Sequence, residues 1–159
     1  MNEIIEDLVE QMNDSFKRAE HSVYVSLKYT RTVDVIKNLV DRFIITLSLS
    51  VDALVEYLEE KNLIDEKPDT LIERINLIIN HFEENANIKE FMNLLLFLRK
   101  VSRAEYGTCE EFRRHVTMSV VIEGEKYNID IDILTEYYHK VKDYVKYISN
   151  LVQEIKEDE

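Results

Sequence analysis

The sequence predicts a mainly α-helical, up-and-down bundle of four to five helices with one inserted β-hairpin. Three observations support this fold class. The 159 residues include only 2 Gly and 1 Pro, so few positions break a helix. Apolar residues recur every three or four positions over most of the chain, which is the spacing of an amphipathic helix. Residues 116–131 instead alternate apolar and polar side chains, which is the spacing of a β-strand.

The first predicted helix runs to about Tyr29, and the second runs to about Lys61. Thr30 or Thr32 supplies the N-cap between them, because a threonine hydroxyl accepts from the free backbone N–H groups of a first turn. The second helix breaks before Pro68, since the residue that precedes a proline is disfavoured in helical dihedrals. The apolar stripe of these two helices consists of Ile5, Leu8, Val9, Met12, Phe16, Ala19 and Val23, then Ile36, Leu39, Val40, Phe43, Leu47, Val51, Leu54 and Leu58.

Two further helices precede the hairpin. Asp69 or Thr70 caps the third, whose apolar stripe ends at Phe82. The fourth is apolar on nearly every face over residues 91–98, so we expect it at the centre of the bundle. Gly107 ends this helix in the way that a C-terminal glycine does.

The hairpin and a last helix complete the single predicted domain, residues 1–159. The hairpin turns at Gly124, and its apolar face must be covered, for which a second copy of the chain is one candidate. Asp132 caps the last helix, and the acidic end at 156–159 frays. The alternating apolar residues of the hairpin are Val116, Met118, Val120, Ile122, Tyr127, Ile129 and Ile131.

The composition excludes several classes of protein. Lys and Arg total 20 against 32 Asp and Glu, a formal net charge of −12, and such a surface repels a nucleic-acid backbone at long range. The single cysteine, Cys109, forms neither an intramolecular disulfide nor a cysteine-rich metal site. The acidic start is unlike a signal peptide, and no apolar run has the length of a membrane span. We therefore expect a cytoplasmic protein, and the abundance of Glu, Lys, Ile and Tyr with few Gln is typical of a heat-adapted source.

Three groups of side chains have the spacing of a site but lack its other parts. They are Glu136 with His139, the acidic run Glu56, Glu59 and Glu60, and Cys109 with His115. The first lacks the second Glu-x-x-His and the further carboxylates of a di-iron bundle. The second lacks a facing acidic pair for magnesium, and the third lacks an orienting group for a nucleophile. We therefore expect no metal and no cofactor.

Residues 99–115 differ in charge from the rest of the chain. They contain five Lys or Arg against three Glu, a formal balance of +2, whereas the remainder has a balance of −14. A local positive region concentrates an anion that the rest of the surface repels. In the alternative interpretation, these arginines pair with acids of neighbouring helices. The basic residues are Arg99, Lys100, Arg103, Arg113 and Arg114, followed by His115.

Residues 98–106, Leu-Arg-Lys-Val-Ser-Arg-Ala-Glu-Tyr, resemble the signature of the HEPN superfamily, particularly its HepT-like branch. That signature is Arg, often Asn, three more residues, His, any residue and Tyr. Arg99 matches its Arg, and Tyr106 matches its Tyr. The resemblance implies an α-helical bundle, commonly dimeric. It also implies a relation to ribonucleases of toxin–antitoxin and defence systems, whose Arg and His cleave RNA at a dimer cleft, and to non-catalytic members that bind nucleotides or partners.

The sequence departs from this signature at its histidine. Ala104 occupies the histidine position, and alanine cannot exchange a proton. Lys100 replaces the frequent Asn. His115 lies eleven residues further on and acts in place of the missing histidine only if the hairpin folds back over the helix. The resemblance covers 33–106 and 131–152, with the hairpin as an insertion.

The predicted binding site combines guanidinium groups for a phosphate with a tyrosine ring for a base. In the structural alternative, Arg99 and Arg103 bridge to acids of the last helix while Tyr106 packs in the core. A divergent ribonuclease would instead use Arg99 and Arg103 with His115 as catalytic residues. The candidate ligand-binding residues are Arg99, Arg103, Tyr106, Arg113 and Arg114.

The function expected from these residues is that of a HEPN-like helical binding or adaptor protein without ribonuclease activity, which binds a nucleotide, RNA or a partner protein. The alternatives are a divergent, metal-independent HEPN-type endoribonuclease and a plain helical protein–protein interaction module. The resemblance implies a homodimer and a protein partner such as a nucleotidyltransferase-type antitoxin. Contact with nucleic acid is expected only locally, and contact with a membrane is not expected.

Overall fold

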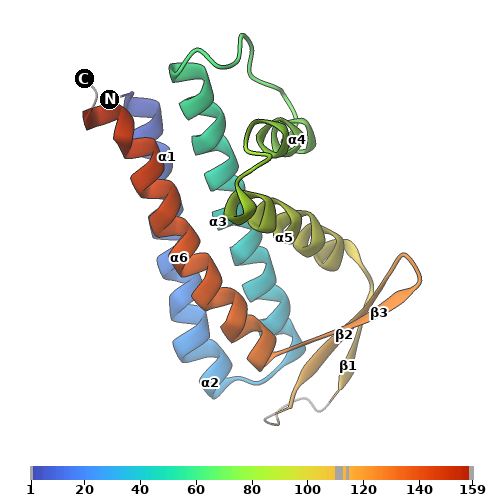
Figure 1. Cartoon of the computed structure of the whole chain (residues 1–159). Helices are drawn as coiled ribbons and strands as arrows, with labels where there is room; N and C mark the ends of the chain where they lie inside the picture. The colour runs from blue at the N-terminus through green and yellow to red at the C-terminus, as the bar shows by residue number, and fades with distance from the viewer. Residues whose placement is uncertain (1, 110–112, 114, 158–159) are drawn as a thin grey trace.

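Figure 1 shows the computed structural model of the chain, which describes residues 2–109, 113 and 115–157. The chain is mainly helical with a small antiparallel sheet, which confirms the predicted fold class. α1, α3 and α6 run along the length of the molecule. No helix among the described residues has the length and apolar character to cross a membrane. The elements are α1 (Glu3–His21), the π-helix η1 (Ser22–Ser26), α2 (Leu27–Tyr29), α3 (Val33–Glu60), α4 (Leu71–His81), α5 (Ala86–Arg103), β1 (Tyr106–Cys109), β2 (Thr117–Ile122), β3 (Glu125–Asp130) and α6 (Ile131–Glu157).

Threonine side chains cap α3 and α4. The hydroxyl of Thr32 accepts a hydrogen bond from the backbone N–H of Val35 at 3.3 Å. The hydroxyl of Thr70 accepts from the N–H of Glu73 at 3.2 Å. One of the two expected residues is thus the cap in each case, and each satisfies a backbone donor that the first turn leaves free.

The cap of α6 is Asp130, the last residue of β3, and the prediction of Asp132 is wrong. Oδ1 of Asp130 accepts from the N–H of Ile133 at 2.9 Å. The helix follows the strand without a loop, so Asp132 already lies in the first turn. An acid there favours the helix through the dipole rather than as a cap.

α3 is the centre of the bundle, since it contacts α1, α4, α5 and α6. The prediction that residues 91–98 form the centre is wrong. α5 crosses the long helices obliquely (Figure 1), and Leu94, Leu96 and Phe97 remain partly exposed. The fully buried side chains of α3 include Val33, Ile36, Leu39, Val40, Phe43, Leu47, Val51 and Leu54.

The predicted hairpin is present as β2 and β3. These strands are antiparallel, with Val120 opposite Tyr127. Glu123 and Gly124 form the turn, with φ values of 54° and 84°. Both are left-handed conformations, which suit the twist of a two-residue hairpin turn and favour glycine.

β1 is a third strand that the sequence pattern did not predict. It pairs antiparallel with β2, from Tyr106 opposite Val120 to Cys109 opposite Thr117. The prediction that Gly107 ends the preceding helix is wrong, because α5 ends at Arg103 and Gly107 lies within β1. The sheet order is β1-β2-β3, so β1 is an edge strand.

The apolar face of the hairpin is covered by the same chain. Met118, Val120 and Ile129 are buried, and β2 contacts α3 and α5. The rings of Phe97 and Tyr127 pack edge to face at 5.0 Å between centroids. The hairpin therefore does not need a second copy of the chain to bury its apolar face, and that reason to expect a dimer is removed.

Candidate functional site

Three of the predicted binding residues lie where α5 ends and β1 begins. Arg99 and Arg103 are one turn apart on α5, and Tyr106 is the first residue of β1. Tyr106 does not continue the helical face of Arg99 and Arg103, because the backbone is extended at Ala104, with φ −74° and ψ 150°. The three residues belong to one junction between helix and sheet, which we call the α5–β1 corner (Figure 1).

Arg99 is the residue of this corner whose environment is unusual. It is partly buried, and its Nη1 atom has no hydrogen-bond partner among the described residues. A buried donor left without an acceptor costs about 1–3 kcal/mol. Arg103 is exposed, and within the described residues no ion pair joins either arginine to a carboxylate. The structural alternative, in which both arginines bridge to acids of α6, therefore has no support from these residues.

A polar cluster that the sequence analysis missed ties α5 to α3 beside Arg99. The hydroxyl of Ser102 donates to Oδ1 of Asp41 at 2.6 Å. Nζ of Lys37 lies 3.2 Å from the Ser102 hydroxyl and 3.4 Å from Oδ2 of Asp41. Ser102 follows Arg99 by three positions, so the two are neighbours on the helix surface. The four-residue spacing of Lys37 and Asp41 was the available signal, but their contact with α5 is tertiary.

Tyr106 does not pack in the core. The residue is 40% exposed, and its hydroxyl donates to Oδ1 of Asp34 at 3.3 Å. It lines a cavity of about 560 Å³ on the sheet with Glu105, Gly107, Ser119, Val121 and Lys126. Lys126 and Glu105 give this cavity one charge of each sign.

Lys100 contacts the turn of the sheet and is not part of the predicted ligand site. Its Nζ donates to Oε1 of Glu123 at 3.0 Å, across to the β2–β3 turn. Both side chains are largely exposed, with 54% and 77% of their surface accessible, so the pair contributes little to stability.

The second half of the basic segment lies at the other end of the sheet. Arg113 and His115 are exposed, and Arg114 falls outside the described residues. His115 lines a cavity of about 150 Å³ with Arg31 and Asp132 rather than with Arg99. The strand β1 separates the two ends by three residue steps, or about 10 Å. The structure thus does not bring together the Arg and His of the ribonuclease alternative.

The Glu-x-x-His pair of α6 lies on the surface. Glu136 and His139 are exposed, and Glu136 is 3.5 Å from the ammonium of Lys140. That ammonium also bonds Oε1 of Glu90 at 3.2 Å, and this contact raises the pKa of Lys140. Across the described part of the chain, no group of His, Cys, Asp and Glu is placed to hold a metal ion.

The acidic run at the end of α3 anchors the following loop. The side chain of Glu56 is 9% exposed, and its Oε1 accepts from Nζ of Lys67 at 2.7 Å. This hydrogen bond raises the pKa of Lys67. Glu59 lies 3.9 Å from the same ammonium. The acids therefore face a lysine of their own loop rather than a second acidic pair.

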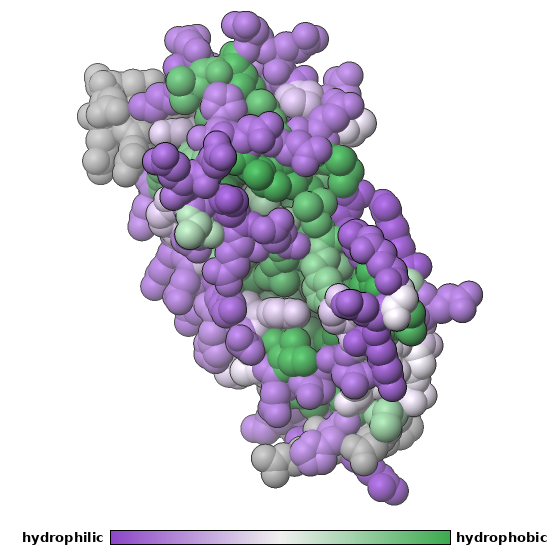
Figure 2. Space-filling model, turned by 45° about the vertical axis from the view of Figure 1, so that its right-hand side comes forward, coloured by the Kyte–Doolittle hydropathy of each residue, from purple (hydrophilic) through white to green (hydrophobic). Residues whose placement is uncertain are grey.

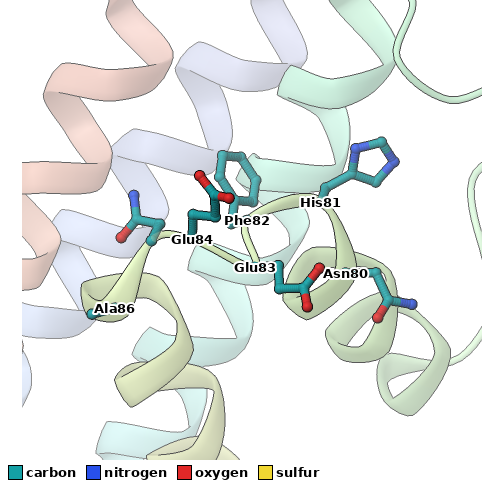
Figure 3. A pocket seen from close by; sticks show the side chains of 7 residues that line it. Asn80, His81, Phe82, Glu83, Glu84 and Ala86 are labelled. Carbon is teal, nitrogen blue, oxygen red and sulfur yellow. The ribbon is translucent and has the colours of Figure 1, made fainter.

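A surface cavity with a volume of about 690 Å³ lies at the α4–α5 connection (Figure 3). His81, Glu83 and Glu84 line it, yet their side chains point in different directions. A binding site needs polar groups that converge on one point. This cavity therefore lacks the arrangement of a site.

Comparison with known proteins adds no relative. No family model, no curated protein sequence and no solved structure matches the chain.

Proposed function

We propose that this chain is a HEPN-like helical binding protein without ribonuclease activity of its own, and that its α5–β1 corner holds the phosphate of a nucleotide-sized ligand. Arg99 and Arg103 bind phosphate oxygens in this proposal, and the partly exposed ring of Tyr106 stacks on a base. Arginine suits the first role because its planar guanidinium group donates two parallel hydrogen bonds to a phosphate. An aromatic ring suits the second because every base has a face to stack on.

The observation that supports this site is the state of Arg99. Arg99 is partly buried, its Nη1 atom has no hydrogen-bond partner, and it forms no ion pair with a described carboxylate. Charged side chains that are withdrawn from water are normally paired. A phosphate bound beside this group would supply a counter-charge.

Two observations speak for binding rather than cleavage. Ala104 stands at the position where the resembling ribonucleases have histidine, and it cannot act as an acid or a base. His115 lies with Arg31 and Asp132 at the other end of the sheet, away from Arg99. The α5–β1 corner therefore has groups that bind an anion and lacks a histidine that transfers a proton.

Isothermal titration calorimetry with ATP and with AMP, both without magnesium, tests this function. The double variant Arg99→Gln/Arg103→Gln is expected to weaken binding at least tenfold, since charge-assisted hydrogen bonds contribute about 1.5–3 kcal/mol each. The matched control is Lys142→Gln/Lys146→Gln, which removes two exposed charges of α6. The control is expected to change the affinity less than twofold.

Three outcomes contradict the proposal. One is the absence of nucleotide binding by the unchanged protein, and another is equal binding by the double arginine variant. The third is cleavage of RNA that disappears in both Arg99→Ala and His115→Ala, which would favour the divergent ribonuclease.

For partners, we propose a homodimer in the cytoplasm, and an associated nucleotidyltransferase-type antitoxin as the resemblance implies. The outer face of the sheet supports self-association, because Val121 is 62% exposed and β1 is an edge strand. Figure 2 shows apolar surface among hydrophilic residues on the side that carries α4, α5 and the sheet. Light scattering at micromolar concentration tests the dimer, and a mass of one chain that does not change on dilution would refute it.

A further inference from the structure

A second basic segment occurs in the chain, apart from residues 99–115. Residues 17–31 contain four Lys or Arg against the single acid Glu20, a formal balance of +3. This segment covers the end of α1, the π-helix η1 and α2. π-Helical turns within α-helices are frequent at functional sites.

The two basic segments meet in space. Arg31 and His115 line one cavity with Asp132, and Arg113 lies in the connection between β1 and β2. Figure 1 shows α2, the start of α6 and the nearby end of the sheet at the end of the bundle opposite the start of α1. We call this region the basic end. Its described basic residues are Lys28, Arg31 and Arg113, and Lys17 and Arg18 lie further along α1.

The cations of the basic end have no acidic partners among the described residues. No ion pair joins any of the five to a carboxylate, whereas elsewhere Lys67 and Lys140 each contact two acids. Glu20 is engaged separately, because its Oε2 accepts from the hydroxyl of Tyr138 at 2.6 Å. These cations are therefore available to an anionic ligand, and Asp132 is the acid that shares the cavity of Arg31 and His115.

Aromatic side chains are exposed among these cations. Tyr29 is 75% exposed and Tyr24 is 59% exposed, which places both among the most exposed large hydrophobic residues described. The ammonium of Lys28 lies 5.7 Å from the ring centroid of Tyr29, within the range of a cation–π contact. An exposed tyrosine ring beside unpaired cations is the chemistry that binds bases and phosphates of an unpaired strand.

We propose that the basic end binds single-stranded nucleic acid. Lys28, Arg31 and Arg113 contact phosphates, and Tyr29, with Tyr24, stacks on bases. Acidic residues elsewhere on the surface repel the rest of the strand, so contact is restricted to this end. The proposal is independent of the nucleotide site at the α5–β1 corner, since no residue is shared.

Fluorescence anisotropy with labelled twelve-nucleotide oligouridylate and oligothymidylate tests the proposal at several salt concentrations. The unchanged protein is expected to bind one or both with a Kd on the order of 10 µM, the range of non-specific binding. A duplex of the same length is expected to bind more weakly, because its bases are not free to stack. Tyr29→Ala is expected to lower the affinity at least fivefold, which corresponds to about 1 kcal/mol of stacking.

Charge removal tests the phosphate contacts. Lys28→Gln/Arg31→Gln is expected to lower the affinity and to reduce the slope of log affinity against log salt by about 1.4, or about 0.7 for each lost contact to a single strand. The control Lys142→Gln/Lys146→Gln removes two charges from another face and is expected to leave both quantities unchanged. Tyr29 and Lys28 are exposed, so the variants are expected to remain folded. Circular dichroism melting of each variant checks this.

The proposal is overturned if the unchanged protein shows no binding up to about 100 µM at low salt. It is also overturned if Lys28→Gln/Arg31→Gln binds normally while Arg99→Gln/Arg103→Gln does not, because the strand would then lie at the α5–β1 corner. Binding to anionic lipid vesicles without binding to either oligonucleotide would assign the basic end to a membrane surface instead.

Discussion

The hydroxyl of Tyr106 donates a hydrogen bond to Oδ1 of Asp34 at 3.3 Å, across 72 positions of sequence. It links the first residue of β1 to the first turn of α3 and so holds the edge strand against the bundle. The long distance and the exposure of both groups make the bond weak.

Replacing one partner of this bond is expected to have a small effect. Tyr106→Phe removes the hydroxyl and keeps the ring, so the free energy of unfolding should fall by less than about 1 kcal/mol, as is usual for a solvated hydrogen bond. Urea denaturation measures the change. A loss of several kcal/mol would mean that the bond organises the whole sheet.

The contact between Lys67 and Glu56 is expected to matter more, because Glu56 is buried. Lys67→Met leaves this carboxylate without its 2.7 Å partner, and we expect a loss of about 1–3 kcal/mol, the cost of an unsatisfied buried group. Lys140→Met is the matched control, since it breaks the exposed pair with Glu90 and should lower the stability much less. Equal losses in the two variants would show that Glu56 is solvated.

Stability is expected to fall at alkaline pH through the buried tyrosines. Burial raises the pKa of Tyr144 above its ordinary value of 10.0. Burial, with hydrogen bonds to Glu20 and Tyr24, also raises the pKa of Tyr138. Above about pH 10 the unfolded chain ionises these phenols while the folded chain keeps them protonated, so the unfolded state is favoured as pH rises.

Tyr144→Phe isolates this contribution. Each such tyrosine makes the free energy of unfolding fall by about 1.4 kcal/mol per pH unit once the unfolded chain is ionised. The variant should therefore show a shallower decline than the unchanged protein between about pH 10 and pH 11. Parallel declines would mean that Tyr144 ionises in the folded state.

Gly124 is expected to be required by the conformation of the β2–β3 turn. Its φ of 84° is unfavourable for a residue with a Cβ, although no atom lies within 4 Å of where that Cβ would be. Gly124→Ala should therefore cost about 1–2 kcal/mol through backbone strain alone. Thermal melting tests this, and an unchanged midpoint would mean that the turn relaxes to another conformation.

Sequence periodicity was sufficient to predict the elements whose signal is local. The helices and the β2–β3 hairpin follow from spacing, and Thr32 and Thr70 are caps because their hydroxyls act within one turn. β1 was missed because Tyr106–Cys109 has only four residues, all of them exposed, and is a strand only through its pairing with β2. A short segment without alternation carries no local signal of a distant partner.

The candidate site was predictable only in part for the same reason. Arg99 was found from a motif, whereas the bond from Ser102 to Asp41 joins residues 61 positions apart and depends on how α5 crosses α3. The basic end could be predicted from the sequence, since the charge balance of residues 17–31 exceeds that of residues 99–115. The proximity of this segment to Arg113 and His115 could not be predicted, because it depends on the tertiary structure.

Replacing Arg99 by methionine separates a functional arginine from a structural one. The unpartnered Nη1 atom predicts that the charge costs stability in the folded chain, and methionine keeps much of the apolar stem that packs against the helix. Arg99→Met should therefore leave the free energy of unfolding unchanged or raise it by about 1 kcal/mol, as replacing buried charges by apolar groups often does. Nucleotide binding should fall at least tenfold in the same variant.

If Arg99 instead neutralises an acid, removing it leaves that acid unpaired, and urea denaturation will show a loss of about 3 kcal/mol or more. Such a loss would assign Arg99 to the bundle rather than to a ligand.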